Sequence, residues 1–161
     1  MSIHEWLIGV DPGLKTGIAL VEREDNTAHV AWSGEVPPEE IAPTIRPWLE
    51  WWRQDTYGRR LTVVVEAYVI TMATAQKTQQ GWSLEGIGIV KQCMRDVGMD
   101  MDKQFVLQRP AVKEIVDNAK LKRIELWHRG GAGHANDAIR HCVVRMIGTG
   151  WVDPRLLERT K

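Results

Sequence analysis

The chain has few cysteines and no long apolar run. The first absence argues against a protein held together by disulfides or zinc, and the second against a membrane-spanning protein. Its 161 residues include only Cys93 and Cys142, neither of them in a CxxC pair or a Cys/His ligand spacing. This argues against a structural zinc site and favours buried free thiols of a reducing compartment. No stretch is apolar for long enough to cross a bilayer, and no basic-plus-apolar signal segment opens the chain. We therefore expect one soluble, cytoplasmic domain over residues 1–161.

The chain also lacks a net charge, since 21 Lys and Arg residues balance 21 Asp and Glu residues. The total therefore gives no support to nucleic-acid binding. The distribution is uneven, however, because residues 1–75 hold six basic and eleven acidic side chains, whereas residues 76–161 hold fifteen and ten. This asymmetry suggests an electropositive face built from the second half.

The first third of the chain has the pattern of three consecutive strands. Residues 6–10 form an unbroken apolar run, residues 17–21 form a second, and residues 27–32 alternate as an edge strand would. Short turns at 11–14 and 24–26 join them, which predicts an antiparallel meander.

The remaining elements alternate between helices and strands. We expect helices at 38–54 and 76–97, and Pro43 and Pro47 predict a kink or a late start in the first of them. Further along, we expect strands at 61–66 and 105–107, a helix starting at 111–116, a basic segment at 120–129, a glycine-rich loop at 130–133 and a last helix at 135–147. This order predicts an α/β domain with a five-stranded mixed sheet and helices on both faces.

Three acidic residues stand at the ends of predicted elements. Asp11 ends the first strand, Glu66 ends the fourth, and Asp137 opens the last helix, three residues after His134. A carboxylate at the end of a buried strand needs a partner, because unpaired burial of a charge is costly. If the first and fourth strands are neighbours and the last helix crosses their ends, these side chains converge.

Such a cluster of oxygen ligands suits Mg²⁺ or Mn²⁺ better than zinc. Two ions held about 3.5–4 Å apart would support attack of water on a phosphodiester. Each residue alone also has an ordinary structural explanation. Asp11 lies in a turn sequence, Glu66 could face solvent, and Asp137 is favoured near a helix N-terminus.

Four stretches of the sequence, in order, carry a family resemblance. They are IGVDPGLKTG at 8–17, VEAY at 65–68, RPAVK at 109–113 and HANDA at 134–138. With these motifs, spread over nearly the whole chain, the sequence resembles the RuvC family of Holliday-junction resolvases. The resemblance implies a ribonuclease H-like fold and a homodimer that nicks a four-way DNA junction. It fits a bacterial or a phage-encoded enzyme, acting in the cytoplasm of the bacterial or phage-infected host cell.

The resemblance also implies roles for the clustered residues. Asp11, Glu66 and Asp137 would bind Mg²⁺ or Mn²⁺, with two ions in each active site. Many members of the family have a fourth acid where this chain has His134, and others have a histidine there. We therefore include His134 among the catalytic and metal-binding residues, with an effect on metal affinity or preference.

Further residues are candidates for contact with DNA. Family members place an aromatic residue after the second acid to stack on junction bases, and Tyr68 is the nearest candidate. Stacking on an unpaired base contributes roughly 1–3 kcal/mol. Lys113, Lys120, Lys122 and Arg123 would contact phosphates. The alternatives are a half-buried aromatic at a strand end and a solvated basic face.

Three other functions compete with junction cleavage. A nuclease of the same fold could act on flaps, forks or RNA–DNA hybrids, and a non-catalytic module could only bind branched DNA. Actin-like ATPases also begin with a Gly-x-Asp-x-Gly turn, but they need two such domains and a second phosphate loop. The presence of all three acids favours a metal-dependent, structure-selective endodeoxyribonuclease.

Overall fold

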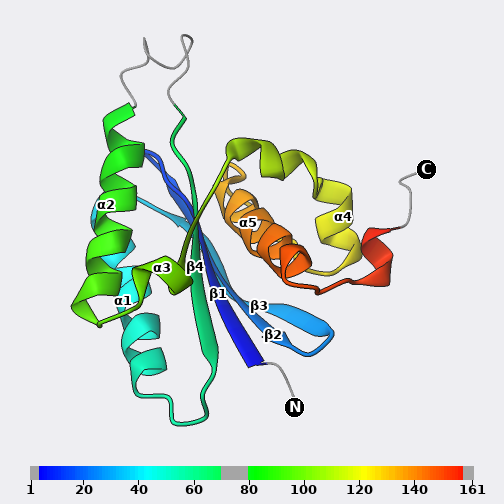
Figure 1. Cartoon of the computed structure of the whole chain (residues 1–161). Coiled ribbons are helices and arrows are strands. Elements are labelled where there is room, and N and C mark those ends of the chain that lie inside the picture. Colours follow the sequence, from blue (N-terminus) through cyan, green and yellow to red (C-terminus); the bar gives the residue numbers. More distant parts are fainter. Residues whose placement is uncertain (1–3, 70–79, 158–161) are drawn as a thin grey trace.

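A five-stranded mixed sheet forms the centre of the molecule. A computed structural model describes residues 4–69 and 80–157 (Figure 1). The sheet has the order β3-β2-β1-β4-β5, in which β2 is antiparallel to β1 and β3, while β4 runs parallel to β1 and β5. The strands are β1 (His4–Asp11), β2 (Thr16–Glu24), β3 (Thr27–Val36), β4 (Arg60–Glu66) and β5 (Phe105–Gln108). The predicted sheet is thus confirmed, including the neighbouring first and fourth strands.

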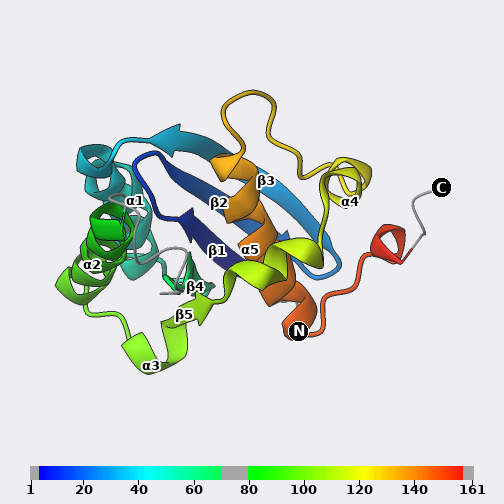
Figure 2. The ribbon, with the colours of Figure 1, turned by 90° about the horizontal axis from the view of Figure 1, so that it is seen from above.

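Helices cover both faces of this sheet, as predicted (Figure 2). The helices α1 (Pro38–Arg53) and α2 (Gln80–Asp96) bury one apolar cluster against it, which includes Ile8, Ile45 and Val63. On the other face, α5 (His134–Gly148) and α4 (Asn118–Arg123) enclose a second cluster around Leu7 and Val64. Successive residues of β1 and β4 point to opposite clusters, so both strands are buried on both faces.

The helix α1 differs from its prediction in one respect. It begins at Pro38, and Pro43 and Pro47 both lie inside it, so the late start expected from these prolines is wrong. A proline removes the hydrogen bond to the carbonyl four residues earlier. Both prolines are exposed, so water can bind the carbonyl groups that they leave without a helical partner.

The remaining elements are short. They are α3 (Met101–Gln104) and two 3₁₀ turns, η1 (Pro110–Glu114) and η2 (Pro154–Leu156). The helix expected at 111–116 is thus a 3₁₀ turn, and α4 forms in the basic segment, where Asp117 accepts from the Lys120 backbone N–H. The predicted start of α2 at residue 76 lies outside the described residues. Both cysteines are buried and free. No helix within 4–69 and 80–157 has the length and apolarity to span a membrane.

Candidate active site

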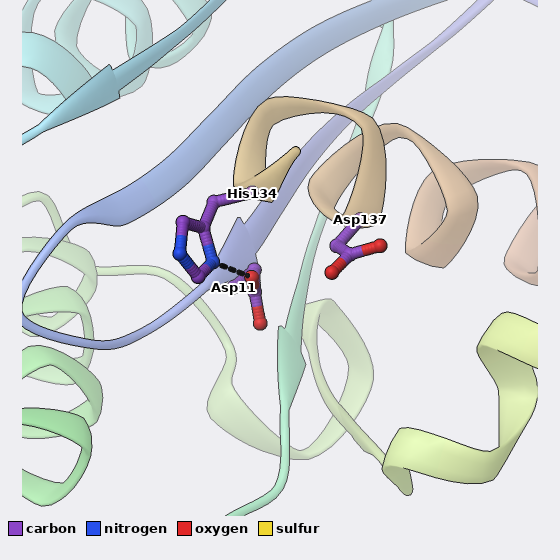
Figure 3. A group of neighbouring side chains, drawn as sticks. All are labelled: Asp11, His134 and Asp137. Atoms are coloured by element: carbon purple, nitrogen blue, oxygen red, sulfur yellow. Dashed lines mark hydrogen bonds and ion pairs between the residues drawn. The ribbon is translucent and has the colours of Figure 1, made fainter. Parts of the chain in front are cut away.

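The strand order brings the two strand-end acids together. The pairing of Val10 with Val65 aligns the parallel strands β1 and β4, so Asp11 and Glu66 end at the same edge of the sheet. The helix α5 begins over this edge, with His134 as its first residue and Asp137 in its first turn (Figure 3). Asp11 and Asp137 each offer a carboxylate oxygen and His134 offers a ring nitrogen, and these three atoms lie within 4.8 Å of one another.

Two glycines allow α5 to approach the sheet this closely. A Cβ atom on Gly9 of β1 would overlap the Ala138 carbonyl oxygen, and one on Gly17 of β2 would overlap that of His134. Any larger side chain at these positions would push the start of α5 away from the sheet. The glycines therefore set the distance between Asp11 and the residues of the helix.

A glutamate from β3 holds the N-terminus of α5. The Glu35 carboxylate accepts hydrogen bonds from the backbone N–H groups of Ala132, Gly133 and His134, at 3.0, 2.8 and 3.0 Å. Burial acts to raise the pKa of Glu35, but these three donors hold it below its usual value. The carboxylate thus satisfies donors that a helix start leaves unpaired. The sequence-based prediction missed Glu35, although it is an acid at the end of a strand, like Asp11 and Glu66.

The Lys113 ammonium lies between the three carboxylates. Its Nζ donates to Glu66 Oε2 at 2.6 Å, Asp137 Oδ2 at 3.0 Å and Asp11 Oδ1 at 3.2 Å. Burial acts to lower the pKa of Lys113, but the surrounding carboxylates, Asp11 above all, raise it well above its usual value. All three acids therefore face a single position, and a cation occupies it. The prediction had placed Lys113 against a DNA phosphate and not among the acids.

The acids titrate in different environments. Burial raises the pKa of Asp11, although a hydrogen bond from His134 and the charge of Lys113 act against that rise. Burial would also raise the pKa of Glu66, but hydrogen bonds from His141 and Lys113 lower it to about 2. Glu66 is thus a stable carboxylate, whereas Asp11 is a buried acid that a further cation would favour in its charged form.

Two histidines orient these carboxylates. His134 Nδ1 donates to Asp11 Oδ2 at 2.8 Å, and this hydrogen bond, opposed by burial, raises the pKa of His134. His141 is fully buried, and its Nε2 donates to Glu66 Oε2 at 3.0 Å. Its Nδ1 lies 2.8 Å from the side-chain oxygen of Gln108 at the end of β5. His141 and Gln108 therefore fix the rotamer of Glu66, in the way that second partners orient metal ligands.

The carboxylate of Asp137 is also held by a neighbouring side chain, which belongs to its own helix. Arg140, one turn further along α5, pairs with Asp137 and also contacts the side chain of Asn118. The Nε of Arg140 donates to the Val116 backbone oxygen at 2.8 Å. Arg140 is buried, so it links the acid to the segment between η1 and α4.

The predicted DNA contacts on α4 lie apart from the acidic cluster. On α4, Lys120 Nζ donates to the Ile115 carbonyl at 2.8 Å, and Lys122 Nζ lies 4.8 Å from the centre of the Trp127 ring. Arg123 donates to the Arg155 carbonyl at 3.1 Å. None of these contacts reaches the acids, and the role of α4 in DNA binding stays a prediction.

Tyr68 follows Glu66 into the loop after β4. Its ring is half-buried and packs against the apolar cluster of α1 and α2. Its hydroxyl is buried without a hydrogen-bond partner in the described part of the chain. The ring also lines a small pocket with Pro12, Ser83 and Pro110 beside the acidic cluster. Its stacking on DNA bases stays a prediction.

The donor set fits a hard divalent cation. Carboxylate oxygens dominate it, one imidazole accompanies them, and neither cysteine lies in the cluster. Such ligands suit Mg²⁺ or Mn²⁺ and differ from those of structural zinc. The contacts of Lys113 with three carboxylates show that a cation can be shared at this position.

The similarity of this chain to known proteins lies in its fold and not in its sequence. No protein-family model matches the sequence, and no curated protein matches it. Among solved structures, the chain is similar to Thermus thermophilus RuvC, with a TM-score of 0.63 and 17% identity over 90% of this chain and 96% of that one. T. thermophilus RuvC in complex with a Holliday junction substrate gives a TM-score of 0.62 and 16% identity over 91% of this chain and 97% of the other. The predicted ribonuclease H-like fold, in its RuvC form, is thus confirmed.

Proposed function

We propose that this protein is a divalent-metal-dependent endonuclease that hydrolyses phosphodiester bonds in branched DNA, with the four-way junction as its expected substrate. One observation carries the proposal. Carboxylates from the ends of β1 and β4 and from the start of α5 converge on one cation, within 2.6–3.2 Å of the Lys113 Nζ. The fold shared with the RuvC–junction complex supports the choice of substrate.

Asp11, Glu66, Asp137 and His134 would hold Mg²⁺ or Mn²⁺, two ions in each active site. Divalent ions bound there supply an activated water and charge stabilisation for the leaving oxygen. The chain's own groups orient the carboxylates. His141 fixes Glu66, Arg140 fixes Asp137, and the His134 ring holds Asp11.

Lys113 would have two positions in this proposal. Without a divalent cation its single charge partly compensates the acids, and its side chain is about one quarter exposed, so it has a path to solvent. A divalent cation at the same position would repel the ammonium, which could then bind a phosphate oxygen of the DNA. This accounts for both its place among the acids and the predicted phosphate contact.

A cleavage panel tests the proposal. The substrates are a four-way junction, a flap, a replication fork, a linear duplex and an RNA–DNA hybrid, each with Mg²⁺ or Mn²⁺. We expect the wild-type protein to cut the junction and Asp11→Asn and Glu66→Gln to bind it without cutting. Glu39→Gln, which removes an exposed carboxylate on α1, should cut normally. Undiminished cutting by Asp11→Asn or Glu66→Gln would refute the metal-site assignment.

The same panel separates the competing functions. Preferred cutting of flaps, forks or hybrids would assign a different substrate to the same site. Junction binding without cutting by the wild-type protein would indicate a binding module. The proposed homodimer is tested by light scattering, because the mass should be twice the 18.3 kDa of one chain.

A further inference from the structure

A basic cavity lies at the end of the sheet opposite to the acidic cluster. Its volume is about 500 Å³. Five cationic side chains and one carboxylate, Glu5, line it; the cations are Arg23, Arg59, Arg60, Lys103 and Arg145. Three of these cations belong to residues 1–75, where acidic residues are in excess. The cavity is therefore a product of the fold and not of the charge distribution along the sequence.

Three elements connect the acidic cluster and the basic cavity, because each of them carries a residue of the cluster near one end and a residue of the cavity near the other. Strand β1 carries Glu5 and Asp11, β4 carries Arg60 and Glu66, and the α5 helix has Arg145 near its C-terminus (Figure 1). Six residues of a strand span about 20 Å, so the cavity is well separated from the acids. A ligand in the cavity would not contact the proposed metal site.

The cavity opens where the edge of β4 is uncovered. Strand β5 pairs with β4 only from Val63 onward, so no strand of the described part of the chain pairs with Arg60–Thr62 on that side. The side-chain amide of Gln104 in α3 donates to the Leu61 carbonyl at 3.1 Å and closes part of this edge. The rest of the edge borders the cavity.

Three of the five cations have acidic partners. Arg23 pairs with Glu5 at 3.4 Å, Arg59 with Asp55 at 3.5 Å and Lys103 with Asp100 at 3.0 Å. Arg59 is also held over the rings of Trp6 and Trp51, at 5.4 and 5.2 Å from their centres. Arg23 and Arg59 are thus held in place by their partners, whereas the Lys103 side chain is largely exposed.

Arg60 and Arg145 differ from the other three. Within the described residues, no carboxylate pairs with either of them, and the Nε of Arg145 is buried with no hydrogen-bond partner. A cation in the last turn of α5 is favoured by the helix dipole, but that interaction leaves the Nε–H unsatisfied. Neither guanidinium group is paired with a carboxylate of the described residues, so an anion in the cavity would supply the opposite charge.

We propose that this cavity binds a phosphate group through Arg60 and Arg145. A guanidinium group matches the oxygens of phosphate in a bidentate geometry and stays charged at all physiological pH values. The phosphate belongs either to a small phosphorylated molecule or to the backbone of a DNA strand that passes this end of the protein. The site is separate from the proposed nuclease site and does not depend on it.

Titration calorimetry of the full chain in EDTA tests the proposal, because the chelator prevents phosphate from binding through a metal. Inorganic pyrophosphate and a short DNA duplex serve as the two probes. At least one of these probes should bind the wild-type protein. We expect Arg60→Gln and Arg145→Gln each to bind that probe about tenfold more weakly, since each variant loses a charge-assisted contact. Arg95→Gln, which removes an exposed cation from α2, should bind like the wild-type protein.

The two probes distinguish the source of the phosphate. Arginine-dependent binding of pyrophosphate assigns the site to a small phosphorylated ligand, and arginine-dependent binding of the duplex alone assigns it to the DNA backbone. The proposal is overturned if neither probe binds, if Arg60→Gln and Arg145→Gln keep wild-type affinity, or if Arg95→Gln loses as much. The melting temperature of each variant is the control for folding, because the Nε of Arg145 has no hydrogen-bond partner among the described residues and Arg60 is exposed, so neither substitution should lower it.

Discussion

Replacing Lys113 by methionine removes the ammonium that partly compensates the three carboxylates and keeps the proposed metal ligands. The Lys113 Nζ contacts Asp11, Glu66 and Asp137 within 3.2 Å, so the variant leaves three carboxylates around an uncompensated position. Methionine retains much of the apolar stem, so the loss reports mainly on the charge. We expect the metal-free variant to be less stable and to bind a divalent cation more tightly than the wild-type protein.

The size of the effect follows from the contacts. Removing one partner of a buried ion pair costs about 3–5 kcal/mol, and the partial exposure of this side chain lowers that to roughly 2–3 kcal/mol. For a chain of this length, such a loss lowers the melting temperature by about 4–12 °C. The ammonium no longer opposes the incoming cation, so the dissociation constant for Mn²⁺ should fall by about tenfold or more.

Thermal unfolding with and without Mn²⁺, together with calorimetric titration, measures both quantities. At a concentration 100 times the dissociation constant, the cation adds about 2.7 kcal/mol of stability, which would restore most of the loss in the variant. Lys103→Met is the matched control, because the Lys103 side chain is 82% exposed and its one carboxylate partner among the described residues is Asp100. Weaker or unchanged Mn²⁺ binding by Lys113→Met would show that the ammonium and the metal do not share one position.

Three further substitutions test the support of the site. Glu35→Gln should lower stability by about 1–2 kcal/mol and reduce cleavage, because three N–H groups at the start of α5 lose a charged acceptor; an unchanged melting temperature would contradict this. His134→Asp should keep cleavage activity with a changed preference between Mg²⁺ and Mn²⁺, whereas complete loss would show a role that a carboxylate cannot fill. Gly17→Ala should cost more than about 2 kcal/mol, since its Cβ would overlap the His134 carbonyl, while Gly88→Ala, with open space around it in α2, should be neutral or stabilising; equal effects of the two would refute the close-approach argument.

Much of the fold could be read from local patterns. The apolar runs of β1 and β4 and the alternation in β3 predict strands because side chains of a strand alternate between its faces. The sequence allowed β1 to lie beside β4 but did not require it, and the structure shows this pairing. Of the two outcomes expected from the prolines of α1, a kink or a late start, the late start was wrong, because the exposure that lets water replace the lost hydrogen bonds is a tertiary property.

The acids at the ends of elements could also be found in the sequence, since Asp11 and Glu66 each follow a buried run and Asp137 opens a helix. Their convergence needs two parallel strands that end at one edge and a last helix that begins over that edge. The partners of these acids could not be found in this way. Lys113 and Gln108 reach the cluster from η1 and β5 through contacts that no spacing along the chain encodes. His141 follows Asp137 by four residues in α5, so helical periodicity predicts that it lies near the same face, but not that it contacts Glu66.

The sequence alone therefore determined the elements, the two-sided burial of the sheet and the identity of the acids, because these depend on neighbours within a few residues. Only the tertiary structure decided that an ammonium lies among the carboxylates and that Glu35 caps α5. It also decided that arginines from an acidic half of the chain line a basic cavity with Arg145. Electrostatic contacts join side chains across tens of residues, so their pairing depends on the packed fold and not on local pattern.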